Sequence, residues 1–280
     1  MTFEKIKYLV FTPELKDSGF VQSAINYNVP CIPVIDARSA VYVATGISAQ
    51  NREVVVVCLD SGNTSRSAFS GLTEAYYRNL PVVLITFGSK LDYSKELRDV
   101  VYGHYIVRFQ DQINELLETK LPIHIEWQTA STKTSVYRSK KIYDSLKKIL
   151  DKEVYLYIGQ GIDIPEQTFS CRVVRGGMIN CLDGAVANVL GASLAKKHKR
   201  YIGLISEEEY VHDLNTLGNI HINDMLMFIV VVQKTSAMLE GYAKSLGFKV
   251  YTTQEKEMEI SVRNLIFNGK KTVLFVLRET

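Results

Sequence analysis

A cluster of ionisable side chains follows the apolar run at residues 201–205, where Ser206 precedes three consecutive glutamates, Glu207 to Glu209. Carboxylate oxygens are ligands that Mg²⁺ prefers in proteins. Ser206 and Glu209 also match the S-x-x-E capping box that begins a helix, where acidic side chains suit the positive end of the helix dipole. We therefore expect Glu208 and Glu209 to serve a helix start. For Glu207, metal binding and a structural role stand as equal alternatives.

The charge of this cluster restricts what it binds. Three carboxylates at one helix start would repel an anionic ligand such as a diphosphate unless a cation intervened. The carboxylates from Glu207 to Glu209 also offer an acid and a base for proton transfer without any cofactor, which is a further alternative.

A second group of small residues lies at 61–64, where it follows an apolar run and Asp60. Such residues expose backbone amides at a helix start, where anions bind. Asn63 offers a donor for a developing oxyanion, although turn formation alone would also select asparagine. Both interpretations stay open.

Apolar β-branched runs alternate with amphipathic segments along the whole chain. The predicted strands are 6–11, 31–35, 53–59, 81–87, 104–109, 122–127, 153–158, 171–174, 200–205, 227–233, 248–253 and 271–277. The predicted helices include 66–79, 111–118, 185–197 and 236–246. Continuous apolar strands separated by helices indicate parallel sheets covered on both faces. The fold class is therefore α/β, with two doubly wound domains.

The predicted boundary between the domains falls in a polar, irregular stretch. Residues 1–128 form the first predicted domain, 129–150 a linker that contains a helix, and 151–280 the second domain. Ligands of parallel α/β sheets bind beyond the carboxyl ends of the strands. The polar groups at 61–64 and 206–209 follow predicted strands, so both lie where such a ligand would bind.

The composition is that of a soluble globular protein, with 46% apolar and 22% charged residues. The net charge of +3 is spread along the chain, which argues against a nucleic-acid partner. The longest apolar run, 225–232, is too short to span a bilayer, so no membrane partner is expected. Cys31, Cys58, Cys171 and Cys181 lack metal-ligand spacing, and we expect four unpaired thiols in a cytoplasmic protein.

Several motifs, in order along the chain, resemble one enzyme family. The motifs are DARSA (36–40), DSGNT (60–64), EAYYRNLPVVLIT (74–86), LPIHIEW (121–127), the stretch at 175–195 and the stretch at 203–217. The first four resemble the pyrimidine-binding domain of the thiamine-diphosphate-dependent enzymes, and the last two resemble their diphosphate-binding domain. The closest branch is that of the menaquinone-pathway SEPHCHC synthase and acetolactate synthase. The resemblance covers nearly the whole chain and lacks only the family's middle domain.

The resemblance implies a cofactor site with altered residues. The family glutamate that hydrogen-bonds the aminopyrimidine ring falls at Ala37, which cannot make that bond. Neighbouring Asp36 is expected to face the opposite way at a strand end, which makes it a poor substitute. Asp183 and Gly184 match a family turn that lies beside the cofactor's pyrimidine, and they are candidate cofactor-binding residues.

At the diphosphate end, the resemblance places Glu207 and Gln233 at the positions of two family metal ligands. Both offer oxygen atoms to Mg²⁺, but each side chain is one methylene longer than the family's residue. Ser206 replaces the glycine before the first ligand. Lys234 replaces a second asparagine, where it would neutralise a diphosphate directly or pair with the glutamates in place of the metal.

Ser61, Gly62 and Asn63 match a family loop that lines the substrate side. The resemblance thus implies a compact lyase or carboligase that acts on a 2-oxo acid, with thiamine diphosphate and Mg²⁺ as cofactors. Because the family's active sites form between subunits, it also implies a homodimer or homotetramer. The alternative is a cofactor-free relative that keeps the fold as a binding or assembly subunit, with Glu207 and Lys234 as an ion pair.

Overall fold

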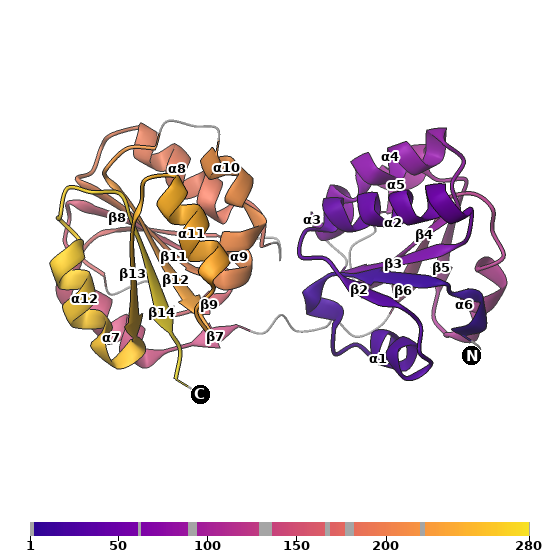
Figure 1. Cartoon of the computed structure of the whole chain (residues 1–280), viewed down its shortest axis with the longest axis horizontal. Coiled ribbons are helices and arrows are strands. Elements are labelled where there is room, and N and C mark those ends of the chain that lie inside the picture. Colours follow the sequence, from indigo (N-terminus) through magenta and orange to yellow (C-terminus); the bar gives the residue numbers. More distant parts are fainter. Residues whose placement is uncertain are drawn as a thin grey trace. The chain divides into compact units, whose positions relative to one another are not determined.

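The computed structural model describes residues 3–60, 63–88, 94–128, 136–165, 169–176, 182–218 and 222–279, with only the backbone described at residues 63, 64, 94 and 95. The chain divides into two compact units, residues 1–134 and 135–280, which are the first and second domains (Figure 1). Among the described helices, none is both long and apolar enough to cross a membrane.

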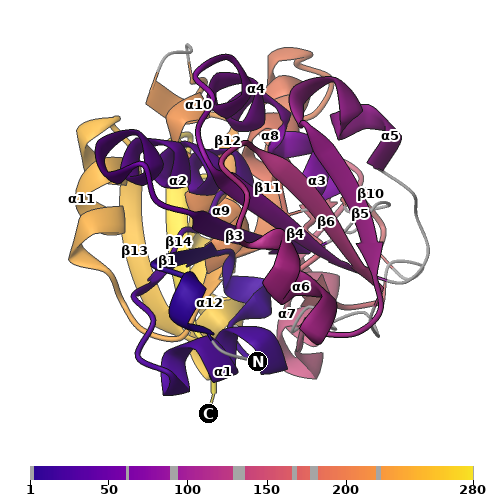
Figure 2. The same cartoon turned by 90° about the vertical axis from the view of Figure 1, so that its right-hand side faces the viewer.

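The first domain is built on a six-stranded sheet in the order β2-β1-β3-β4-β6-β5, and all its strands run parallel. Figure 2 shows β1, β3, β4, β6 and β5 of this sheet. Its strands are β1 (Tyr8–Phe11), β2 (Cys31–Pro33), β3 (Val55–Asp60), β4 (Val82–Gly88), β5 (Gly103–Val107) and β6 (Ile123–Gln128). Every residue of β3 and β4 is buried. These strands read as unbroken apolar runs because helices cover both of their faces.

One face of the first sheet packs against α1 (Gly19–Asn26) and α6 (Asp111–Leu116). The opposite face packs against α2 (Ala37–Asn51), α4 (Phe69–Tyr77) and the end of α5 (Ser94–Leu97). The domain also contains the short helix α3 (Asn63–Ser67) and the 3-10 helices η1 (Phe3–Lys5), η2 (Pro13–Leu15) and η3 (Arg98–Val100).

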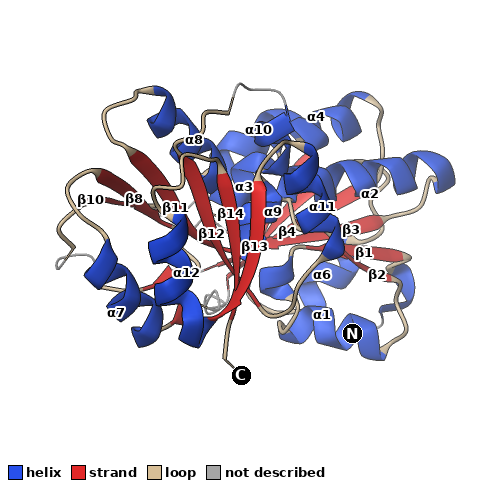
Figure 3. Cartoon of the chain, turned by 60° about the vertical axis from the view of Figure 1, so that its left-hand side comes forward, coloured by secondary structure: helices blue, strands red, loops and turns tan. Residues whose placement is uncertain are grey.

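The second domain repeats this plan. Its six-stranded parallel sheet has the order β10-β8-β11-β12-β14-β13, which is the first domain's order when each set is counted along the chain (Figure 3). The strands are β8 (Val154–Ile158), β10 (Arg172–Arg175), β11 (Arg200–Ser206), β12 (Leu226–Val232), β13 (Lys249–Gln254) and β14 (Thr272–Leu277). Two short strands, β7 (Tyr137–Arg138) and β9 (Ile162–Asp163), form a separate parallel pair.

Helices again lie on both faces of the second sheet. One core contains residues of α7 (Lys140–Ile149) and α12 (Met258–Leu265). The other contains residues of α8 (Ala185–Leu194), α9 (Glu207–His212), α10 (Leu214–Gly218) and α11 (Ala237–Ser245). A 3-10 helix, η4 (Glu255–Glu257), follows β13.

The structure confirms the predicted fold class of two doubly wound α/β domains, and each predicted strand overlaps an observed one. The helix that the sequence places in a linker, α7, belongs to the second domain. Its residues Ile142 and Leu146 and the following Leu150 are buried in that domain's core. Hence the described part of the second domain begins before α7, at β7.

Candidate functional site

Helix α9 begins with the capping box that the sequence predicts. The Ser206 Oγ accepts a hydrogen bond from the Glu209 backbone N–H at 3.3 Å, and the Glu209 carboxylate accepts one from the Ser206 backbone N–H at 2.9 Å. These reciprocal bonds satisfy two amide groups that a helix start otherwise leaves without partners. The expectation for Glu209 is therefore confirmed.

The Glu209 carboxylate also holds the loop that follows β8. It accepts a hydrogen bond from the Gln160 backbone N–H at 2.6 Å and another from that of Gly161. A Cβ atom at Gly159 would lie 2.3 Å from a Glu209 carboxylate oxygen, so glycine is needed there for the loop to approach so closely. Burial raises the pKa of Glu209, and its hydrogen bonds with Ser206, Gly161 and Gln160 oppose that rise. Because Glu209 is turned inward, it does not serve as a proton donor or acceptor to a bound ligand.

Glu207 lies at the carboxyl end of β11 beside the end of β12. In the sheet Ser206 pairs with Val231, so Glu207 comes next to the residues that follow β12. Its half-buried carboxylate accepts a hydrogen bond from the backbone N–H of Gln233, and the charge of Lys234 also acts on it. The fold thus brings Glu207 next to Gln233 and Lys234, which are distant from it in sequence.

Arg278 is a further member of this group that the sequence analysis does not identify. It follows β14, and its backbone N–H donates to the carbonyl of Val232 at 3.1 Å, which places it beside the end of β12. Burial is the main cause that raises the pKa of Glu207, and Glu208 adds to it; Arg278 and Lys234 lower it. The sequence alone gives no reason to select Arg278, because it is a single arginine after a strand. It joins the group because β14 lies next to β12 in the sheet.

These residues do not suit a Mg²⁺ ion. The Glu207 carboxylate is already bonded to a backbone amide, and the side chain of Gln233 is exposed. Lys234 and Arg278 would also place two positive charges near the ion, whereas Mg²⁺ requires oxygen donors in near-ideal octahedral geometry. The donor set predicted from the resemblance therefore has unfavourable surroundings for a divalent cation.

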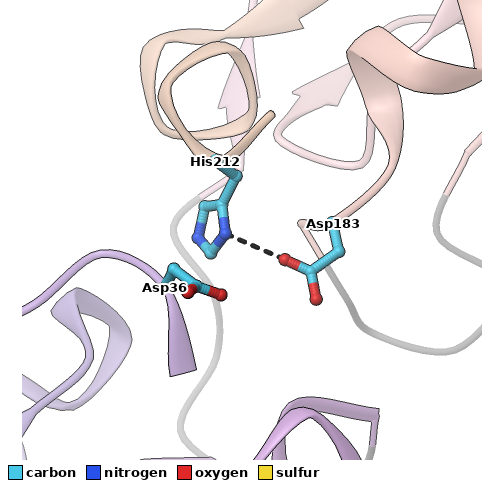
Figure 4. A group of neighbouring side chains, drawn as sticks. All are labelled: Asp36, Asp183 and His212. Carbon is cyan, nitrogen blue, oxygen red and sulfur yellow. Dashed lines mark ion pairs between the residues drawn. The ribbon is translucent and has the colours of Figure 1, made fainter. Parts of the chain in front are cut away.

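Asp183 and Gly184 lie at the start of α8. Gly184 is the N-cap residue, with a φ of +84° that favours glycine. The Asp183 carboxylate lies 2.8 Å from Nδ1 of His212 on α9 (Figure 4). Figure 4 also draws Asp36, which belongs to the first domain.

The amides at the start of α8 are occupied by Asp213, which follows α9. Its carboxylate accepts hydrogen bonds from Ala187 at 3.3 Å and from the backbones of Gly184 and Val186. Burial is the main cause that raises the pKa of Asp213. Asp213 thus joins the start of α8 to the end of α9.

The structure corrects the expectation for Asp36. Strand β2 ends at Pro33, and Asp36 is the N-cap of α2, where its carboxylate accepts hydrogen bonds from the Ser39 backbone N–H at 2.8 Å and the Ser39 hydroxyl at 2.5 Å. Asp36 is therefore not a strand residue, and the alternation of side chains along a strand does not determine where its carboxylate points. Ala37 is the first residue of α2, is 3% exposed, and packs into the core with Val10 and other first-domain residues.

The structure describes only some of the remaining residues that the sequence predicts to be functional or unpaired. Asn63 begins α3, but only its backbone is described, and Ser61 and Gly62 lie outside the described residues. The cysteines at positions 31, 58 and 171 are free, as predicted. The fourth cysteine, Cys181, lies outside the described residues.

Comparison with known proteins finds similarity to one group. Residues 1–116, all in the first domain, match the family described as "Thiamine pyrophosphate enzyme, N-terminal TPP binding domain". Among curated proteins, 2-succinyl-5-enolpyruvyl-6-hydroxy-3-cyclohexene-1-carboxylate (SEPHCHC) synthase of Geobacillus thermodenitrificans is 36% identical over 88 residues, which are 28% of this chain and 14% of that protein. The synthase of the same name from Nostoc sp. is 33% identical over 106 residues, 36% of this chain and 17% of that protein. The matches thus span less than a fifth of either relative.

Proposed function

We propose, from its relationship to the thiamine-diphosphate-dependent enzymes near the SEPHCHC synthase branch, that this chain is a compact lyase or carboligase that binds thiamine diphosphate and acts on a 2-oxo acid. The observation that carries the proposal is the shared end of β11 and β12. There Ser206, Glu207, Gln233 and Lys234, the residues that the resemblance assigns to the diphosphate end, lie together. Ligands of parallel α/β sheets bind at this edge.

The cofactor would supply an electron sink for the carbanion left when a 2-oxo acid loses carbon dioxide. This chain's residues would bind and orient it. Lys234 would offset the diphosphate charge, and Asp183 and Gly184 would lie toward the pyrimidine. By the same resemblance, the loop of Ser61, Gly62 and Asn63 would line the substrate side. We propose a homodimer or homotetramer, because active sites of this family form between subunits.

One observation favours a second candidate, a cofactor-free relative that acts as a binding or assembly subunit. The position of the family glutamate, Ala37, is buried in an apolar core and offers no polar atom to an aminopyrimidine. Proton transfer assisted by a carboxylate at this position is therefore not available to the protein.

Calorimetric titration with thiamine diphosphate, with and without Mg²⁺, distinguishes the candidates. Release of carbon dioxide from a panel of 2-oxo acids should accompany binding if the enzyme proposal holds. Binding without turnover of any 2-oxo acid, or no binding under either condition, would refute it. The absence of binding would leave the cofactor-free relative as the better description.

A further inference from the structure

Charged residues follow the ends of three adjacent strands in the second sheet. Strands β11, β12 and β14 are consecutive neighbours, and they lead into Glu207, Lys234 and Arg278. Val232 pairs with Leu277, so β12 and β14 end at the same level. All strands of the sheet are parallel, so these residues share the carboxyl edge at which α/β sheets bind ligands.

Arg278 is held in place by its surroundings. Its guanidinium lies 5.5 Å from the ring centre of Tyr137. The Tyr137 hydroxyl donates to the buried carboxylate of Glu255, which also accepts from the Ser139 hydroxyl and from the Glu279 backbone N–H. A cation stacked on a fixed aromatic ring loses less freedom when it binds a ligand. The half-buried guanidinium is therefore partly ordered before any anion arrives.

The negative charge at this edge is smaller than the sequence indicates. Glu209 is turned inward and bonded to the loop after β8. Lys234 and Arg278 both act on the Glu207 carboxylate. Among these described residues, Lys234 and Arg278 therefore supply the cations that an anion would need at this edge.

We propose that Lys234 and Arg278 bind a phosphate or diphosphate group directly at the carboxyl edge of the second sheet, in place of a divalent cation. Arginine presents a planar fork that matches two phosphate oxygens, and lysine adds a compact charge. The identity of the natural ligand as thiamine diphosphate rests on the proposed function. The anion site itself does not, because inorganic pyrophosphate carries the same diphosphate chemistry.

This arrangement predicts opposite effects for Glu207 in two mechanisms. If the carboxylate held a metal ion, Glu207→Gln would abolish anion binding. If Lys234 and Arg278 bind the anion directly, Glu207→Gln removes a like charge from beside it and frees both cations, so affinity should be retained or increased. The substitution preserves the shape of the side chain, and Glu207 is not a member of the capping box formed by Ser206 and Glu209.

The test is calorimetric titration of the full chain with inorganic pyrophosphate in low salt, first in EDTA and then with Mg²⁺. We expect binding in EDTA, a rise in Kd of roughly tenfold or more for Lys234→Met and for Arg278→Met, and unchanged or tighter binding for Glu207→Gln. Lys244→Met and Arg263→Met are matched controls, because both residues are exposed on helices of the same domain and pair with a glutamate four residues earlier. These controls should change Kd by no more than about twofold.

Binding that requires Mg²⁺, or that Glu207→Gln abolishes, would overturn the proposal. So would equal losses in the target and control variants. Lys234 is exposed, so Lys234→Met should have the same melting temperature as the parent. This variant alone can decide the test if Arg278→Met does not fold. Pyrophosphate binding in EDTA without any binding of thiamine diphosphate would refute the proposed function and leave this site supported. Binding of thiamine diphosphate only with Mg²⁺ would refute direct binding by Lys234 and Arg278 and leave the proposed function supported.

Discussion

The two domains share one strand order but differ in how they treat the start of the helix that follows their second strand. In the first domain, α2 is capped by its own N-cap residue, Asp36, and the next residue, Ala37, is buried in the core. In the second domain, α8 begins at a glycine, and its free amides are bonded to Asp213 from another helix. The same topology thus supports a self-contained apolar helix start in one domain and a polar, interlocked one in the other.

The strand ends differ in a related way. In the second domain three neighbouring strands lead into Glu207, Lys234 and Arg278, and the two cations oppose the rise that burial causes in the pKa of Glu207. Strand order fixes where a ligand can bind, whereas the residues just beyond the strands decide its chemistry. The stability of the first domain can be followed separately because the chain's single tryptophan, Trp127, packs against that domain's core.

The largest effect is expected for Ala37→Glu. If the core at this position has no room for a ligand, the variant buries an unpaired carboxylate and loses roughly 3 kcal/mol or more of first-domain stability. Urea unfolding followed by Trp127 fluorescence measures the loss. Gln50→Glu, an exposed position near the end of the same helix, is the control for charge. A normal melt together with faster exchange of the thiazolium proton in bound cofactor would instead show that a functional site had been restored.

Glu209→Ala should have the next largest effect, and in the second domain. It removes both the capping box and the anchor of the Gly159–Gly161 loop, and should cost about 2–3 kcal/mol. Circular dichroism should report the loss while the unfolding seen by Trp127 stays unchanged. Glu208→Ala, at the exposed neighbouring residue, should have little effect. Equal effects of the two variants would contradict the inward role of Glu209.

The first domain should lose stability in acid through His124. This histidine is buried, and its Nε2 lies 2.9 Å from the Thr86 hydroxyl oxygen. Burial, and secondly His104, lower the pKa of His124 to about 3 from 6.5. The unfolded chain therefore binds a proton below pH 6.5 while the folded domain does not, so stability present above pH 6.5 is lost as the pH falls toward 3.

At pH 5 the lowered pKa of His124 should reduce the free energy of unfolding of the first domain by about 2 kcal/mol. Urea unfolding of His124→Gln, followed by Trp127 fluorescence, should show a smaller drop between pH 7 and pH 5 than the parent shows. His198→Gln, in the second domain, is the control. Beside the pair of His104 and His124 lies Glu126, whose carboxylate is 3.8 Å from Nε2 of His104. An unchanged pH dependence in His124→Gln would assign the acid sensitivity elsewhere.

The smallest effects should separate the two kinds of cap. Asp36→Ala removes an N-cap and should cost about 1 kcal/mol, seen by Trp127 fluorescence. Asp213→Ala exposes several amides of α8 and also releases the end of α9, so its cost, seen by circular dichroism, should be larger than that of Asp36→Ala. Equal costs would mean that the contact between α8 and α9 adds no stability beyond capping.

The sequence predicts the strands well because strands covered on both faces become unbroken apolar runs. Helix α2 is not predicted as a helix, since Val41, Val43, Thr45 and Ile47 alternate with other residues in a pattern that resembles a strand. The place of α7 is also not predicted. Its amphipathic pattern shows that one face is buried but does not identify which core buries it.

The candidate site is predictable only in part, for a similar reason. The capping box is local, with its partners three residues apart, and it is found correctly. The contacts of Arg278 and of Asp213 join elements that are distant in the chain, so residue type and spacing give no sign of them. Motif resemblance identifies Glu207, Gln233 and Lys234 from the sequence. That Glu209 points inward is seen only in the structure, where its carboxylate contacts the loop after β8.

The strand order of each sheet has a consequence for synthesis on the ribosome. In the first domain β5 lies at the sheet edge beside β6, although β5 is made first, and β6 must then enter between β4 and β5. Until residue 128 has left the ribosome, β5 has no neighbour in its native sheet, and the exposed edge of β4 is open to pairing with other chains. A fragment that stops at residue 116, where the family match ends, therefore lacks the strand that completes the domain.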